Sequence, residues 1–338
     1  MQLSTTKDTK DHEGNPATQR LVSLSDIREA QSRIRGVTVR TKLIPLQHNG
    51  RTLFLKPENQ QPIGAFKLRG AYNKIASLTE QERARGVITY SSGNHAQGVA
   101  YAARALNTKA VIVMPRNAPK IKLDATAALG AEIVLVGPSG VERQIKAEEL
   151  AAEHGYVIVP PYDDEKIIAG QGTTGLEIVE DFPDVDLVLV PIGGGGLISG
   201  VATAIKSLRP EAKVIGVEPE LGADAQASLR AGQVMKFPAE QVLSTIADGL
   251  RAQFVGTLTF EHIRRYVDDV VTVSEEEIMQ AVRILSADPQ TMAEPSGAVA
   301  SAAWLFHPES LPDPKNTVAI ISGGNIDPAL LNKVHQSA

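Results

Sequence analysis

The chain has 338 residues, of which 43% are hydrophobic and 22% are charged, and this composition excludes a wholly disordered protein. Its net charge of −5 offers no basic surface for nucleic acid or for an anionic membrane, so we expect small-molecule ligands. The absence of cysteine excludes disulfides, thiolate nucleophiles and cysteine metal sites, and it fits a cytoplasmic protein.

Residues 1–20 are polar and of mixed charge, and we expect them to form a disordered tail. They lack the apolar run of a signal peptide. No later segment contains the roughly eighteen uninterrupted apolar residues of a membrane helix, so we expect no membrane partner.

Short apolar runs rich in β-branched residues recur along the chain, each followed by a longer stretch with helical spacing. One such stretch begins with Leu197 and Ile198 on its apolar face, and Pro210 should end it. This alternation predicts an α/β fold with mostly parallel sheets covered by helices. The predicted strands span residues 86–90, 110–114, 133–136, 156–159, 186–190, 214–217 and 318–321.

The sequence Pro-Pro-Tyr-Asp-Asp at residues 160–164 is a turn-rich break in the middle of the chain. A chain of this length favours two lobes, and we place a smaller lobe before the break. Asp163, Asp164 and Asp248 are expected to have structural roles in loops. Because the chain ends soon after its last predicted strand, we expect no appended regulatory domain.

Loops of small and polar residues follow three of the predicted strands. They read Ser-Ser-Gly-Asn-His at residues 91–95, four glycines at 193–196, and Ser-Gly-Gly-Asn at 322–325. The ligand crevice of a parallel α/β sheet lies at the carboxyl ends of its strands. We therefore expect the three loops to meet at one site.

Gly193, Gly194, Gly195 and Gly196 precede a predicted helix and would let backbone amides approach an anion closely. We interpret this loop as a phosphate-binding site; the alternative is a tight strand-to-helix turn. A dinucleotide site is disfavoured because Ile198 occupies the third glycine position of that fingerprint. Two alternatives come from other classes, a nucleotide-dependent oxidoreductase and a non-catalytic anion-binding protein.

Lys67 lies in the small and partly apolar stretch Gly-Ala-Phe-Lys-Leu-Arg-Gly-Ala at residues 64–71. Burial there would disfavour its ammonium form, and the neutral amine is the form that condenses with an aldehyde to give a Schiff base. On these residues alone, a surface lysine at the start of a helix is the simpler alternative.

Five motifs occur together and in order, namely residues 64–71, Ser-Ser-Gly-Asn-His-Ala-Gln at 91–97, Ala-Gly-Gln-Gly-Thr at 169–173, the glycine loop and residues 322–325. With them the sequence resembles the fold-type II pyridoxal-phosphate family, and within it the threonine and serine dehydratases and the serine racemases. The resemblance covers residues 53–325.

The resemblance implies a two-lobed fold like that of the tryptophan synthase β-subunit, with pyridoxal 5′-phosphate as cofactor. A large cofactor-binding domain would comprise residues 21–78 and 161–338. A small mobile domain, residues 79–160, would close on the substrate. The family is usually dimeric, so a homodimer is expected.

In that family the lysine of the Phe-Lys motif binds the cofactor, so the resemblance assigns this role to Lys67, with Phe66 packed beside the cofactor. The glycine loop would hold the cofactor phosphate, and Asn94 would hydrogen-bond the ring hydroxyl. Ser322 would face the pyridine nitrogen, where a hydroxyl, unlike an aspartate, gives a weaker electron sink that suits β-elimination. The alternative is that Ser322 is a plain turn residue.

The same resemblance places the substrate carboxylate in the loop that contains Ser91, Ser92, Gly93 and His95. Ser92 also matches the residue that acts as the second acid or base, opposite Lys67, in amino-acid racemases. Since dehydratases have the same serine, it does not discriminate between the two activities.

Glu218, Asp224 and the carbonyl of Gly222 have the spacing of a divalent-cation site in racemase and dehydratase relatives. Such oxygen ligands suit Mg²⁺ or Ca²⁺, and the alternative is a solvated acidic loop. The seven histidines include no close pair such as His-x-x-x-His, so a zinc site is not expected.

We therefore predict a pyridoxal-phosphate-dependent ammonia-lyase (dehydratase) that converts a β-hydroxy amino acid such as L-threonine or L-serine to a 2-keto acid and ammonia. Lys67 would be the general base. The alternatives are a serine racemase and a dehydratase specialised for hydroxyaspartate, phenylserine or a related substrate. Ala65 stands where serine is commoner in dehydratases and racemases, and some relatives that act on hydroxyaspartate share it, so the preferred substrate stays open.

Overall fold

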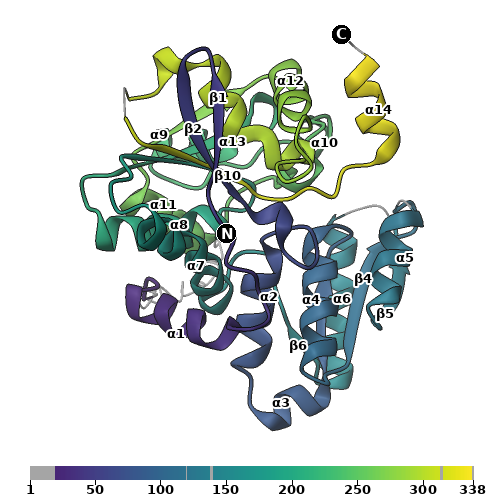
Figure 1. Cartoon of the computed structure of the whole chain (residues 1–338). Coiled ribbons are helices and arrows are strands. Elements are labelled where there is room, and N and C mark those ends of the chain that lie inside the picture. The colour runs from purple at the N-terminus through teal and green to yellow at the C-terminus, as the bar shows by residue number, and fades with distance from the viewer. Residues whose placement is uncertain (1–19, 119, 138–139, 313–314, 337–338) are drawn as a thin grey trace, which may run out of the picture.

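The computed structural model describes residues 20–118, 120–137, 140–312 and 315–336 of the chain. Apart from Arg20, the tail expected to be disordered lies outside the described residues. Helices cover two sheets, a larger one in the upper part of Figure 1 and a smaller one at the lower right. The predicted α/β class with mostly parallel sheets is confirmed.

The larger sheet has six strands in the order β1-β2-β10-β7-β8-β9. β1 pairs antiparallel with β2, and all other pairs are parallel. β7 and β10 are buried on both faces, which explains why they appear in the sequence as unbroken apolar runs. The strands are β1 Ile44–His48, β2 Arg51–Pro57, β7 Leu187–Pro191, β8 Lys213–Pro219, β9 Asp269–Val273 and β10 Thr317–Ile321.

The smaller sheet is entirely parallel, with the order β5-β4-β3-β6. The chain leaves the larger sheet after β2, forms the smaller sheet and returns to the larger one at β7. The strands are β3 Val87–Tyr90, β4 Ala110–Pro115, β5 Glu132–Val136 and β6 Val157–Ile158.

Helices provide the connections that parallel strands require. Several begin at sequence signals, such as the capping boxes of Ser23, Thr79 and Ser274. The α-helices are α1 Leu24–Ile34, α2 Lys67–Ala76, α3 Glu80–Arg85, α4 Asn94–Ala105, α5 Lys120–Ala128, α6 Gly140–His154, α7 Glu165–Asp181, α8 Gly196–Leu208, α9 Asp224–Ala231, α10 Ala239–Leu243, α11 Thr257–Tyr266, α12 Glu275–Leu285, α13 Pro295–Phe306 and α14 Pro328–Gln336. The 3₁₀ turns are η1 Glu58–Gln60, η2 Glu220–Gly222, η3 Asp248–Leu250 and η4 Pro308–Ser310.

The core lies on both faces of the larger sheet. Successive residues of β7 point to opposite faces, so Leu187 and Leu189 join the cluster formed with α12 and α13, whereas Val188 and Val190 join the cluster formed with α8 and α11. The sheet is thereby held between two helical layers, and its strand ends are left to carry the loops.

All seven predicted strands are present, with ends that differ by a few residues. The helix expected after the glycine loop is α8, which ends at Leu208 before Pro210. Three strands go beyond the prediction, namely β1, β2 and β9. The β1–β2 hairpin turns at Asn49 and Gly50, which have φ values of 48° and 74°, so the Asn-Gly pair was the signal for it.

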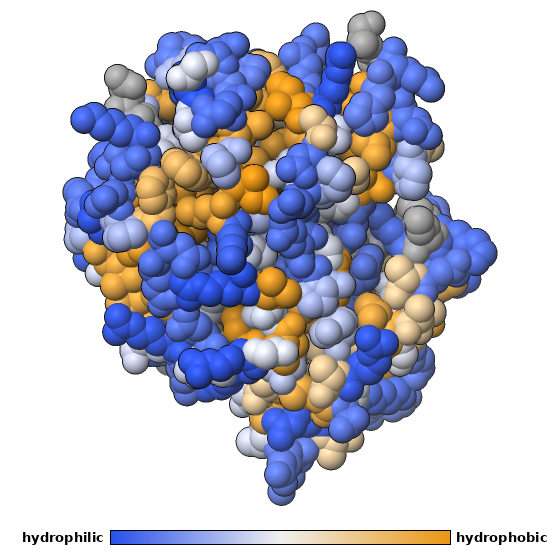
Figure 2. All heavy atoms as spheres, in the orientation of Figure 1, coloured by the Kyte–Doolittle hydropathy of each residue, from blue (hydrophilic) through white to orange (hydrophobic). Residues whose placement is uncertain are grey.

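The surface in Figure 2 is hydrophilic at the lower tip, which is formed by the charged helix α3, and hydrophobic residues gather nearer the middle of this face. None of the described helices combines the length and apolar character that crossing a membrane requires.

Candidate active site

Lys67 begins α2, and its side chain is half-buried with the amine turned into the protein. Its Nζ donates a 2.8 Å hydrogen bond to the carbonyl of Pro161 and lies 5.1 Å from the centre of the Phe66 ring. Among the described residues it has no ion-pair partner. Burial therefore lowers the pKa of Lys67 to about 8, so the amine is readily available in its neutral, nucleophilic form.

The loop before Lys67 is joined to the loop after β10 by backbone hydrogen bonds. The amide of Phe66 donates to the carbonyl of Ser322 at 3.1 Å, and the amide of Gly324 donates to the carbonyl of Gly64 at 2.9 Å. Two of the motifs that are far apart in the sequence are thus neighbours in space, as the strand-end argument predicts.

The glycine loop lies between β7 and α8. Gly195 is the N-cap of α8 with φ at 90°, in the left-handed region that favours glycine. A Cβ atom at Gly194 would lie 2.2 Å from a ring carbon of Tyr162. The first amides of α8 have no partner within the helix, and its N-terminus favours negative charge. The loop therefore has the backbone geometry of an anion-binding site.

Residues 160–164 connect this loop to Lys67, because Pro161 accepts the lysine hydrogen bond while the Tyr162 ring packs against the glycines. Asp163 accepts the amides that begin α11, and Asp164 caps α7. The structural role expected for these two acids agrees with these contacts.

Asn94 begins α4 and is held at both ends of its amide. Its Nδ2 donates to Glu294 at 2.6 Å, and its Oδ1 accepts from Asn325 at 2.8 Å. Asn325 also donates to the carbonyl of Ile63 at 2.8 Å. The Ser-Ser-Gly-Asn loop therefore meets the loop after β10, and all three polar loops lie around Lys67.

The loop expected to receive the substrate carboxylate lies at the N-terminus of α4. The Ser91 hydroxyl accepts the amide of Gly93 at 3.3 Å, and Gly93 is the N-cap of the helix. Ser92 is half-buried. His95 turns its ring into the protein, where Nε2 donates to the carbonyl of Val159 at 3.0 Å.

The imidazole of His95 is neutral. Burial, together with the charge of nearby Lys67, lowers the pKa of His95 to about 3. Its Nδ1 has no hydrogen-bond partner among the described residues. Of the polar groups of His95, this nitrogen and the backbone amide remain available to a ligand. A role in binding the substrate carboxylate is therefore limited to these two groups.

Ser322 is buried at the end of β10, and its hydroxyl donates weakly to the carbonyl of Ser296 at 3.3 Å. The end of β10 therefore presents a neutral hydroxyl group. The nearby residue Glu294 is buried to a similar extent but has an acidic side chain.

Comparisons with known proteins agree with this arrangement. A family model described as pyridoxal-phosphate dependent enzyme matches residues 34–323. This chain belongs to that family. It is 46% identical over 318 residues to an L-threonine ammonia-lyase of Thermotoga maritima, covering 93% of this chain and 78% of that protein.

Two further relatives have different names. An L-threo-3-hydroxyaspartate ammonia-lyase of Saccharomyces cerevisiae is 41% identical over 306 residues, covering 89% of this chain and 93% of that protein. The solved structure of a maize serine racemase superposes with a TM-score of 0.88 at 37% identity, covering 94% of this chain and 98% of that chain. The predicted membership of the dehydratase and racemase group is confirmed.

The residues of this member of the pyridoxal-phosphate-dependent family fit the cofactor. The buried amine of Lys67 suits its aldehyde, and the glycine loop at the start of α8 suits its phosphate. The amide of Asn94 offers a donor for a ring oxygen.

The acids suggested as cation ligands, Glu218 and Asp224, are both fully buried. Glu218 accepts the amides of Ala225 and Gln226 at the start of α9, whereas both carboxylate oxygens of Asp224 lack a partner among the described residues. The alternative interpretation, a solvated acidic loop, is inconsistent with the burial of both side chains. The described ranges contain no group of three or more His, Cys, Asp or Glu side chains that could hold a metal ion, so a cation here would need other oxygen ligands, such as the carbonyl of Gly222.

A buried ion network under α2 has no counterpart in the sequence-based prediction. The Arg69 guanidinium pairs with Glu58 and Glu177, and Lys56 pairs with Glu177. Burial alone would lower the pKa of Arg69, but the two carboxylates raise it above its usual value. The network links β2, α2 and α7 and fixes the turn of α2 next to Lys67.

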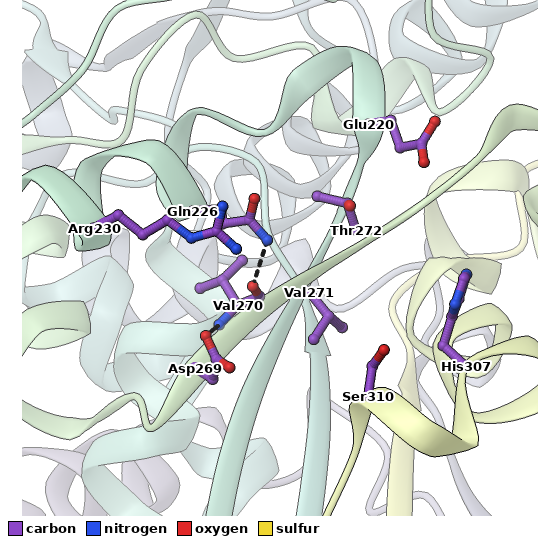
Figure 3. A pocket seen from close by; sticks show the side chains of 9 residues that line it. All are labelled: Glu220, Gln226, Arg230, Asp269, Val270, Val271, Thr272, His307 and Ser310. Carbon is purple, nitrogen blue, oxygen red and sulfur yellow. Dashed lines mark hydrogen bonds between the residues drawn. The ribbon is translucent and has the colours of Figure 1, made fainter.

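A separate hollow of about 360 Å³ lies along the edge strand β9, where Figure 3 shows Gln226 reaching to the carbonyl of Val270 at 2.7 Å. None of its nine lining residues is among those predicted to bind cofactor, substrate or cation. The side-chain amide of Gln226 donates to a backbone carbonyl on the open edge of the sheet. Such a contact makes that carbonyl unavailable to a strand of another chain.

Two further residues near the site, Glu294 and Tyr162, have no functional role in the sequence-based prediction. The signal for Glu294 was an acid directly before Pro295 at the start of an apolar helix, which is also the ordinary pattern of a helix N-terminus. Tyr162 was recognised only as part of a turn.

Proposed function

We propose that this chain is a pyridoxal-phosphate-dependent ammonia-lyase that converts a β-hydroxy amino acid to a 2-keto acid and ammonia. The observation that carries the proposal is the buried amine of Lys67, with its lowered pKa, among three loops suited to phosphate, ring hydroxyl and carboxylate. The names of the two ammonia-lyase relatives support the reaction type.

Lys67 has two tasks in this proposal. Its neutral amine would hold the cofactor through its aldehyde until the amine of the substrate takes that place. The free Lys67 amine would then remove the α-proton as general base, which its pKa of about 8 suits near neutral pH. When bound, pyridoxal phosphate withdraws electrons from the α-carbon and makes that proton removable.

The remaining residues bind and orient. Gly193 to Gly196 and the start of α8 stabilise the phosphate. Ser322 would face the ring nitrogen, and its neutral hydroxyl would not hold that nitrogen protonated as a carboxylate would. This favours elimination of the β-hydroxyl over reactions that need a long-lived carbanion. The N-terminus of α4, with Ser91, Ser92, Gly93 and the amide of His95, receives the substrate carboxylate, since a helix N-terminus favours an anion.

The identity of the β-substituent is the finer part of the proposal. Ala65 is fully buried next to the catalytic turn, where a serine would add a hydroxyl. We place hydroxyaspartate beside threonine and serine as candidate substrates, because one relative is named for threonine and another for hydroxyaspartate.

A serine racemase is the second candidate, favoured by the likeness to the maize enzyme. Racemisation needs an acid or base on the face opposite Lys67, and Ser92 is the residue proposed for it. The two activities are separable, since only the lyase releases a keto acid.

The decisive experiment records the visible absorbance of the purified protein during additions of L-serine, L-threonine, threo-3-hydroxyaspartate and phenylserine, with 2-keto acid measured in the same samples. A band that shifts with keto-acid release supports the lyase and ranks its substrates. Loss of optical activity without keto acid supports the racemase. No band after addition of pyridoxal phosphate would overturn the assignment of Lys67.

The matching variant is Lys67→Ala, which should lose turnover and the visible band. Lys74→Ala, on the same helix but paired with Asp164 at the start of α7, is the control and should keep both. Substantial turnover by Lys67→Ala would contradict the proposed base.

A divalent cation such as Mg²⁺ is proposed at Glu218, Asp224 and the Gly222 carbonyl, because two buried carboxylates without a cation in contact are costly. Adding Mg²⁺ to chelator-treated protein should raise its melting temperature, and Asp224→Asn should abolish that rise. An equal rise in the variant would exclude the site.

We further propose a cytoplasmic homodimer in which the residues around the smaller sheet close on the substrate. The family resemblance supports the dimer, and the lack of cysteine fits the compartment. Sedimentation equilibrium tests the first point, since a single species of 36.0 kDa would contradict it.

A further inference from the structure

Glu294 is a buried carboxyl group that no step of the proposed reaction uses. It lies directly before α13 and is 5% exposed. It has no ion-pair partner among the described residues, and its side chain accepts one hydrogen bond, from Asn94 Nδ2 at 2.6 Å. Burying an acid without a cation is unfavourable, so we expect the hydrogen bond between Asn94 and Glu294 to have a functional role.

The contact completes a directed chain of hydrogen bonds. Asn325 Nδ2 donates to the carbonyl of Ile63 and to Asn94 Oδ1, both at 2.8 Å, and Asn94 Nδ2 donates to Glu294. An amide has one donor end and one acceptor end. A donor at Oδ1 and an ionised carboxylate at Nδ2 both select the same orientation of the Asn94 side chain.

Gly323 makes this arrangement possible. A Cβ atom there would lie 2.4 Å from Glu294 Oε1 and 3.1 Å from Asn94 Nδ2. The carbonyl of Gly323 also accepts the amide of Glu294 at 3.1 Å. Any larger residue would push the carboxylate away from Asn94, so the second position of the Ser-Gly-Gly-Asn motif has a defined steric role.

We propose that Glu294 is a positioning residue that, with Asn325, holds the Asn94 amide so that Nδ2 faces the ring oxygen of the cofactor. Nδ2 has two hydrogens. Glu294 takes one and leaves the other for the ring oxygen. This inference rests on the role given to Asn94 in the proposed function, and it adds the group that orients that residue.

The charge state of Glu294 matters for this role. The pKa of Glu294 is raised to about 7, because burial and the nearby carboxylate of Asp248 raise it by more than the hydrogen bond from Asn94 and the charge of Lys122 lower it. A protonated carboxyl group can donate as well as accept, so it no longer selects one end of an amide. The hold on Asn94 is therefore strongest above neutral pH.

A double-mutant cycle tests the inference. Glu294→Leu is made in the wild-type and in the Asn94→Ala background, and the affinity for pyridoxal phosphate is measured by dialysing each holoenzyme against graded cofactor concentrations. We expect roughly tenfold weaker binding in the wild-type background and less than about twofold in the Asn94→Ala background. Glu294→Gln, whose amide oxygen can still accept from Asn94, should keep most of the affinity.

Glu277→Leu is the matched control, because Glu277 also supports a helix start but lies beside His307 at the other end of α13. It should leave cofactor affinity unchanged. Equal losses for Glu294→Leu in both backgrounds, or no loss in the wild-type background, would overturn the inference.

If Glu294→Leu does not fold, Glu294→Gln decides. The absorbance of the bound cofactor in the wild type should then show a pH inflection near the pKa of about 7 that Gln removes, and its persistence in the variant overturns the inference. Wild-type protein that binds the cofactor but releases no keto acid would defeat the proposed function while leaving this comparison intact.

Discussion

The reactivity of Lys67 follows from its surroundings. Burial lowers the pKa of the amine to about 8, so its neutral form predominates above that pH. We expect the rate at which cofactor-free protein takes up pyridoxal phosphate, followed by absorbance, to rise with pH up to about 8 and then level off. A rate that still climbs toward the ordinary lysine range near pH ~10 would show that the amine is solvated.

The glycine loop depends at one residue on the absence of a side chain. Gly194→Ala would place a Cβ atom 2.2 Å from the Tyr162 ring, and the ring or the loop must move. Overpacking of this kind costs about 1–3 kcal/mol, so we expect cofactor affinity to fall roughly 5- to 150-fold. Gly140→Ala, where the nearest neighbour is an Arg143 nitrogen at 3.5 Å, should leave the equilibrium dialysis result unchanged; an equal fall in both variants would contradict the steric argument.

At the scale of elements, α2 is held by its buried ions. Arg69→Met would leave Glu58 and Glu177 in the interior without their main counter-charge, and we expect a loss of about 3–5 kcal/mol in the free energy of unfolding. Arg40→Met removes two ion pairs at the surface, where such pairs contribute up to about 1 kcal/mol. Urea unfolding of the two variants measures the difference. Similar losses would mean that the network does not support the helix.

The sequence predicted the buried strands better than the edge strands. β7 and β10 are apolar on both faces, so their runs are unmistakable, whereas β1 alternates half-buried and exposed residues and is interrupted by Pro45. β9 is an edge strand in which exposed Asp269 and half-buried Thr272 leave a shorter apolar run than in β7 or β10. The Asn49-Gly50 turn was a usable sign of the β1–β2 hairpin.

The same distinction holds for the site. The glycine loop and the turn before Lys67 depend on backbone geometry, which requires particular residues such as glycine. These residues are visible in the sequence, so the sequence alone indicates this part of the site. Glu294 and Arg69 act through side-chain contacts between segments more than a hundred residues apart, Asn94 with Glu294 and Arg69 with Glu177. A charged residue in a sequence does not reveal that it is buried, so such contacts need the structure.

At the scale of the whole molecule, an ion pair among the described residues joins the parts of the chain around the two sheets. Lys122 on α5, beside the smaller sheet, pairs with Asp248 on η3 in the larger part. Both side chains are partly exposed, so the pair is weak and is screened by salt. If the smaller part closes on the substrate, this contact favours the closed arrangement.

We therefore expect Lys122→Gln to raise KM about two- to fivefold with little change in kcat, since a pair of up to ~1 kcal/mol shifts the closing equilibrium by that factor. Added salt should raise KM of the wild type toward that of the variant and leave the variant unaffected. Lys120→Gln is the control, because Lys120 lies on the same helix but pairs with Asp124 of that helix. A salt dependence that survives in Lys122→Gln would place the sensitive charges elsewhere, whereas its loss would tie substrate affinity to the contact between the two sheets.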